Sequence, residues 1–129
     1  MFRNLVAIAS GGLAAVSFIV AAPVAAHHSY SAFDRSKTIT LQGTIAEMEW
    51  TNPHTYVVLL VKGKGGAQAR WTIEGNPPAG MARDGWKKSG AKVGDVITIV
   101  INPLRVGGNG GHYVSAILPG NVKVGPPAG

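Results

Sequence analysis

The sequence predicts a small, mainly β domain: a five-stranded barrel of the OB type with Greek-key connections and one short helix between its third and fourth strands. Runs of alternating or β-branched residues recur along residues 38–118 at strand length. Gly-rich and Asn-Pro segments separate these runs, and a short helix-like run follows the third. This element order favours the OB barrel over a small open sandwich, which is the alternative.

The predicted strands differ in pattern. Residues 38–50 alternate at first, with Leu41 and Ile45 on one face, and Gly43 is a candidate β-bulge where this long strand bends. Residues 56–61 are aliphatic and β-branched, as in a buried strand. The remaining predicted strands are 69–74, 96–101 and 112–118, the last following the glycine loop 107–111.

The predicted helix follows the third strand. Asn76 is placed to cap it, one of the next two prolines fits its first turn, and Gly85 is placed to end it. Met81 and Trp86 are expected to plug one end of the core.

The N-terminus predicts a signal peptide at residues 1–26. Arg3 precedes an apolar run over residues 5–22, Pro23 interrupts it, and small residues lead to a cut after Ala26. A retained membrane anchor is the alternative, because the run approaches the ~20 residues needed to span a bilayer. The Gly-containing run and its small-residue ending favour cleavage, which leaves no membrane span.

The mature chain is predicted to hold the OB-like barrel at residues 27–118 and a Pro/Gly-rich C-terminal tail at 119–129. A short edge strand is expected at residues 121–124, and disorder in the rest of the tail. Residues 29–37 are polar and irregular, with Tyr30 and Phe33 as candidate anchors onto the barrel.

Composition limits the chemistry. The 129 residues include no cysteine, so thiolate catalysis, disulfides and Cys-based metal sites are excluded. The formal charge of +6 suits anionic partners, or it is simply a solvated surface. No Ser-His-Asp order, P-loop or dinucleotide-binding pattern is present, so we predict a protein that is not an enzyme.

Two adjacent histidines follow the predicted cleavage site. A cut after Ala26 makes His27 the first residue, whose α-amino and ring nitrogens chelate a transition metal together. A cut one residue earlier places His28 third, which also suits Cu(II) or Ni(II). The alternative is that both histidines only belong to a flexible terminus.

The loop at residues 50–54 is the second candidate for metal binding, through His54. Pro53 restricts the residue before it and directs His54, while Asn52 is placed to cap the turn. Trp50 is a further site-shaping residue, and His54 has the alternative of stacking on it and bonding a backbone carbonyl.

His112 and Glu74 are further candidates. In an OB barrel the loop between strands one and two and the loop between strands four and five flank one binding face, so His54 and His112 are predicted to share a side. Glu74 is a candidate acceptor for a histidine N–H, as in outer-shell partners of metal sites. The alternatives are an exposed strand-start histidine and a carboxylate at a helix start.

Several motifs together resemble a family of small exported bacterial proteins known only as a domain of unknown function. They are His27-His28-Ser29, Thr40-Leu41-Gln42-Gly43-Thr44, Trp50-Thr51-Asn52-Pro53-His54, Trp71-Thr72-Ile73-Glu74-Gly75, Gly85-Trp86 and Val93-Gly94-Asp95. The resemblance spans the mature chain and implies a periplasmic OB-type barrel without an established activity. It does not include His112, whose position is not typically histidine in that family.

We therefore predict a periplasmic, non-enzymatic barrel that binds a metal ion, copper first, through His27, His28 and His54. The alternative is an interaction module whose barrel face, with Trp50, Tyr56 and basic residues as contacts, binds an anionic envelope ligand, another small ligand or an envelope protein partner. Nucleic acid is not expected as a partner in that compartment. A copper oxidase of the histidine-brace type is a weaker third hypothesis, because so small a domain offers little substrate surface.

Overall fold

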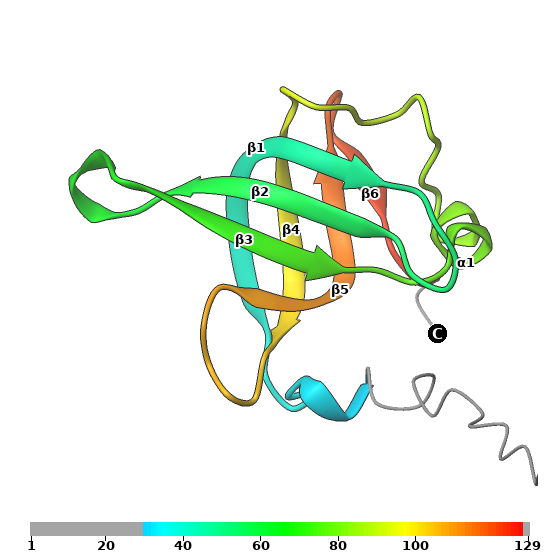
Figure 1. The fold of residues 1–129 in the computed structure, drawn as a ribbon. Helices are drawn as coiled ribbons and strands as arrows, with labels where there is room; N and C mark the ends of the chain where they lie inside the picture. Colours follow the sequence, from blue (N-terminus) through cyan, green and yellow to red (C-terminus); the bar gives the residue numbers. More distant parts are fainter. Residues whose placement is uncertain (1–29, 128–129) are drawn as a thin grey trace, which may run out of the picture.

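Six strands form one sheet that closes on itself (Figure 1). The computed structural model describes residues 30–127. Its elements are η1 (Tyr30–Ala32), β1 (Ile39–Glu49), β2 (Tyr56–Lys62), η2 (Lys64–Gly66), β3 (Gln68–Glu74), α1 (Pro78–Arg83), β4 (Val96–Pro103), β5 (Gly110–Leu118) and β6 (Val122–Val124). The strand order is β3-β2-β1-β4-β5-β6, and a parallel pairing of β3 with β5 closes the first five strands into a mixed barrel.

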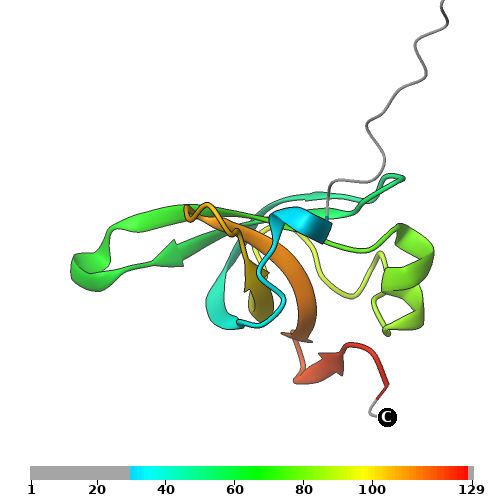
Figure 2. The same cartoon turned by 90° about the horizontal axis from the view of Figure 1, so that it is seen from below.

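This arrangement confirms the predicted fold class. Three strands, a single short helix and two further strands follow one another, with β6 added at the edge of β5. Figure 2 shows α1 at one side of the barrel, while the hairpin of β2 and β3 extends beyond it on the other. Within residues 30–127, no helix is long and apolar enough to cross a membrane. The predicted signal peptide, residues 1–26, lies outside the described part of the chain.

The bend of β1 is at Ala46, so the bulge predicted at Gly43 is wrong. Ile45 lies opposite Leu59 of β2, but Glu47 lies opposite Val58, which leaves Ala46 as the extra residue. The alternation of the sequence changes phase at this position, and a bulge has that effect because it shifts the inward face by one residue.

Gly43 instead allows two strands to approach closely. It pairs regularly with Ile97 of β4. A Cβ atom at residue 43 would lie 2.6 Å from the carbonyl oxygen of Leu60 and 3.1 Å from Cγ2 of Val61. These contacts are too short for any side chain, so glycine is required here by packing and not by a bulge.

The ends of α1 differ in how they are capped. The helix starts after Pro77, which makes no side-chain cap, so the prediction that Asn76 caps it is wrong. At the other end Gly85 has φ +103°. Its N–H donates to Ala82 at 3.1 Å, and the N–H of Trp86 donates to Met81 at 3.0 Å. This is a Schellman motif, and it confirms that Gly85 ends the helix.

The core fills the barrel and continues under α1. Met81 and Trp86 are 1% and 2% exposed, as predicted for residues that plug one end. The ring of Trp86 contacts Tyr113 and Trp50 edge-on, at centroid distances of 5.8 and 6.3 Å. The remaining fully buried aliphatic side chains come from four strands: Ile45, Leu59, Ile73, Ile97, Ile99 and Ile101.

The C-terminal segment belongs to the same core. The predicted edge strand is confirmed as β6, which pairs with β5, and Val124 is 4% exposed. The N–H of Gly125 donates to the carbonyl oxygen of Asp84 at 2.9 Å. The tail thereby ties β6 to the end of α1.

A Gly43→Ala substitution should lower the free energy of unfolding by about 1–3 kcal/mol, because the added methyl group must displace backbone of β2. Urea denaturation measures this change. Gly63→Ala is the matched control, since its Cβ would meet only an ordinary contact at 3.5 Å from the Ala67 oxygen. Equal stability of the two variants would contradict the requirement for close approach at residue 43.

Candidate functional site

The pairing that closes the barrel brings candidate residues together at one end. Strands β3 and β5 run parallel, and Glu74 lies in register with His112. Two glycines begin β5 here and are closely packed: a Cβ on Gly110 would lie 3.3 Å from the Thr72 oxygen of β3 and 2.7 Å from Cδ1 of Leu104, and one on Gly111 would lie 2.6 Å from the Asn102 oxygen of β4. The end of the glycine loop is therefore part of β5 and serves strand packing.

His54 lies in the loop between β1 and β2, with its side chain 18% exposed. Its Nδ1 lies 3.3 Å from the carbonyl oxygen of Gly75 and 3.2 Å from Oε1 of Glu74. Both neighbours are acceptors only, so Nδ1 carries the proton and donates it. In the neutral ring the lone pair is then on Nε2, the atom that a metal would bind.

Glu74 lies between the two histidines. Its side chain is 15% exposed and lies beside His54. Its negative charge also acts on His112 and raises the pKa of that histidine. The N–H of His54 satisfies the geometry of a hydrogen bond to Gly75, so Oε1 of Glu74 lies within ion-pair distance but has no hydrogen-bond partner among the described residues. A buried carboxylate oxygen in this state is a strong acceptor.

His112 is 8% exposed, so the alternative of an exposed strand-start histidine is wrong. Its ring packs against those of Tyr30 and Phe33, at centroid distances of 5.3 and 5.4 Å. Its Nε2 is buried without a hydrogen-bond partner among residues 30–127. Burial lowers the pKa of His112, and the charge of Glu74 opposes this effect only in part.

The segment before β1 is fastened to this end of the barrel. Phe33 is 5% exposed and forms a β-bridge with Leu104. Asp34 donates its N–H to Pro103 at 2.8 Å, and Arg105 donates its N–H to Ala32 at 2.9 Å. The prediction that Tyr30 and Phe33 anchor this segment is confirmed, and the anchoring places Tyr30 directly against His112.

The loop around His54 is organised differently from its prediction. The side chain that bonds across the turn is that of Thr51, whose hydroxyl donates to the carbonyl oxygen of His54 at 3.1 Å, and not that of Asn52 as predicted. The peptide between Asn52 and Pro53 is cis. Trp50 packs edge-on against Trp86, so its ring supports the loop from the core side.

A pocket of about 430 Å³ opens beside His112. Its polar lining includes Arg35, Asn76, Asp84 and Asn102, and Tyr113 adds a buried hydroxyl. Burial, together with the charge of Asp84, raises the pKa of Tyr113 to about 12. Sequence analysis missed Arg35 and Asp84, because nothing in the local pattern links an irregular N-terminal segment to the end of a helix.

The structure thus brings His54, Glu74 and His112 to one end of the barrel, as the OB arrangement predicts. His27 and His28 lie outside the described residues. Within residues 30–127, no group of three or more His, Cys, Asp or Glu side chains is arranged to hold a metal ion.

These features define the class of protein: a small closed β-barrel with a polar pocket and two histidines at one end. The chain belongs to a family of unknown function, DUF6152, whose model matches residues 15–113. A search of curated proteins and a search of solved structures gave no match.

His112 should make folding stability depend on pH. Its pKa in the folded protein is below the ordinary value of 6.5, so the unfolded chain binds more protons as the pH falls past that value. Stability present near neutral pH is then lost on acidification. Urea denaturation at about pH 7.5 and about pH 5 should show a larger loss for the wild type than for His112→Gln. An equal pH dependence in both proteins would contradict a depressed pKa.

Proposed function

We propose that this protein is an exported, periplasmic, non-enzymatic barrel that binds a transition metal, Cu(II) most favourably. After the signal peptide is cleaved following Ala26, the metal would be held by His27, His28 and His54. The bound metal would make the protein a buffer, carrier or sensor of copper. The observation that carries the proposal is the state of His54.

His54 is prepared as a ligand by its neighbours. Its Nδ1 proton is directed to Gly75 with Glu74 alongside, so the lone pair on Nε2 is available without a change of tautomer. Histidine ligands of protein metal sites commonly donate their other ring N–H to a carboxylate or a backbone carbonyl. Here both kinds of acceptor are present.

The anchored segment supports a contribution from the N-terminus. Tyr30 packs against His112, which lies in register with Glu74, and Glu74 contacts His54. His28 precedes Tyr30 by two positions. The covalent chain therefore limits the separation of their Cα atoms to about 7 Å, which keeps the two N-terminal histidines within reach of this end of the barrel.

The described residues supply only part of a donor set that suits copper. The N-terminal residues would supply the rest. Imidazole and amine nitrogens suit Cu(II) best among common divalent ions. His54 supplies one such nitrogen, and Glu74 and the buried Nε2 of His112 are unsatisfied groups nearby. His27 and His28 would supply the others, with the α-amino group of His27 completing the set.

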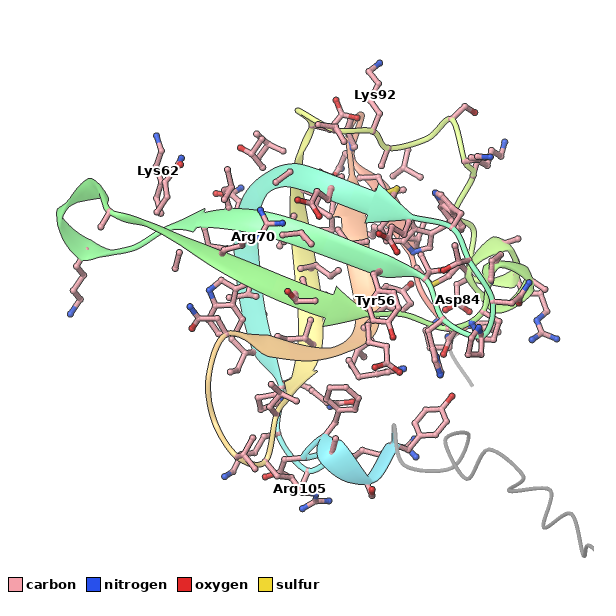
Figure 3. All side chains as sticks on the ribbon, in the orientation of Figure 1. Tyr56, Lys62, Arg70, Asp84, Lys92 and Arg105 are labelled. Atoms are coloured by element: carbon pink, nitrogen blue, oxygen red, sulfur yellow. The ribbon has the colours of Figure 1, made fainter. Side chains whose placement is uncertain are left out.

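The rival interaction module has less support. The outer face beside Tyr56 also carries Glu47, Glu49 and Arg70, and Arg70 pairs with Glu47. Figure 3 shows where Tyr56 and Arg70 lie. Burial and the charges of Glu74 and Glu49 raise the pKa of Tyr56. Because Arg70 is paired with Glu47 and Glu49 lies beside them, this face offers a polyanion little unpaired positive charge.

Tag-free protein that begins at His27 should bind Cu(II) in a competition titration at least about 100-fold more tightly than protein with one glycine added before His27, because the extension removes the α-amine from the chelate. His54→Gln should weaken binding by about 10-fold or more. Intact mass of protein recovered from the periplasm should correspond to a start at His27.

The same glycine extension on a His27→Gln/His28→Gln variant is the control, and it should have little further effect. Unchanged affinity in the extended wild type would remove the N-terminal amine from the proposal. If His54→Gln bound Cu(II) with the affinity of the wild type, the barrel would not contribute a ligand, and the proposal would be reduced to a chelate formed by the N-terminus alone.

A further inference from the structure

We propose that the pocket beside His112 binds a small linear zwitterion, an amino acid whose carboxylate and amine are separated by a short methylene chain. Arg35 would bind the carboxylate and Asp84 the amine. The pocket lies between the anchored N-terminal segment and the end of α1, where Figure 3 shows Asp84.

The two opposite charges of this pocket are not paired with each other. The ion pairs among residues 30–127 join Lys37 with Asp34, His54 with Glu74 and Arg70 with Glu47. Arg35 instead lies over the ring of Tyr30, at 5.9 Å from its centroid. Asp84 is half-buried at the end of α1, with its backbone fixed by bonds to Gly80 and Gly125. One pocket therefore offers a cation and an anion that form no ion pair among the described residues, with Asp84 beside the hydroxyl of Tyr113 and Arg35 over the ring of Tyr30.

The floor of the pocket is polar, buried and unsatisfied. Nε2 of His112 and the hydroxyl of Tyr113 have no hydrogen-bond partner among the described residues, although these side chains are only 8% and 4% exposed. A buried polar atom without a partner costs free energy, which a ligand atom or an ordered water recovers. Asn102 donates its amide N–H to Lys37 at 2.8 Å, which leaves its side-chain oxygen as an acceptor.

The shape and walls set the size of the ligand. A volume of about 430 Å³ lies at the small end of the range for organic ligand sites. Tyr30 and Phe33 offer aromatic surface on which a methylene chain packs. A dianion would meet Asp84, and a simple cation would meet Arg35, so the charge pattern selects a ligand that carries both signs.

This inference does not depend on the proposed metal site. It uses none of His27, His28 and His54, and the two sites share only the neighbourhood of His112. Binding of the zwitterion should therefore persist in protein treated with a chelator, and copper binding should persist in pocket variants. Either proposal can fail while the other holds.

Calorimetric titration of the metal-free protein with 4-aminobutanoate, 5-aminopentanoate and 6-aminohexanoate tests the proposal. The chain length that fits best should bind at least about 10-fold more tightly than hexanoate or hexylamine, because each single-charge analogue loses one charged contact. Absence of heat from every zwitterion at millimolar concentration, or equal binding of the single-charge analogues, would overturn it.

Variants assign the two contacts. Arg35→Gln should weaken binding of the best zwitterion by about 10-fold and abolish any binding of hexanoate. Asp84→Asn should also weaken binding of the best zwitterion by about 10-fold, and it should abolish any binding of hexylamine. Arg70→Gln is the matched control, because Arg70 lies on the outer face, and it should bind as the wild type does. Thermal denaturation of each variant verifies folding. An equal loss in Arg70→Gln, or none in Arg35→Gln and Asp84→Asn, would overturn the assignment.

Discussion

The parallel pairing of β3 with β5 is the contact on which the rest of this structure depends. It converts a meander and a hairpin into a closed barrel, and it sets Glu74 beside His112. The two residues that begin β5 in this pairing are Gly110 and Gly111, and a Cβ on Gly110 would lie 3.3 Å from the Thr72 oxygen of β3. The shorter contacts, at 2.6–2.7 Å, would be with Asn102, Ile101 and Leu104, so these glycines mainly allow β5 to pack closely on the β4 side. A glycine-rich loop that resembles a flexible linker in the sequence is, at its end, part of β5 and closely packed.

Closure also explains why polar groups collect at one end. The loop after β1, the end of β3 and the start of β5 meet there, and the segment before β1 is fastened across them through Phe33 and Asp34. His54 is held by acceptors on Nδ1, whereas His112 is buried under aromatic rings. The two histidines thus have different chemistry: one has an available ring nitrogen, and the other is held neutral by burial.

The two proposed sites use different parts of this end. The metal proposal depends on His54 and on residues before Tyr30, whereas the pocket proposal depends on unpaired charges at Arg35 and Asp84. A core this small leaves little room for buried groups without a purpose, because each unsatisfied polar atom costs a sizeable fraction of the stability of a domain. The unsatisfied atoms of Glu74, His112 and Tyr113 all lie at this end, which is why we place ligand binding there.

The sequence by itself determined the strands, the short helix with Gly85 at its end, and the OB order, because these follow from local periodicity and backbone preference. It also identified Tyr30 and Phe33 as anchors and His54 and His112 as residues of one side. The change of phase after Ala46 was visible in the sequence, but only the strand register showed that it marks a bulge. The packing role of Gly43 and the placing of Arg35 and Asp84 in the lining of one pocket were decided by the tertiary structure alone. They depend on which atoms of distant segments approach each other, and no local pattern of residues carries that information.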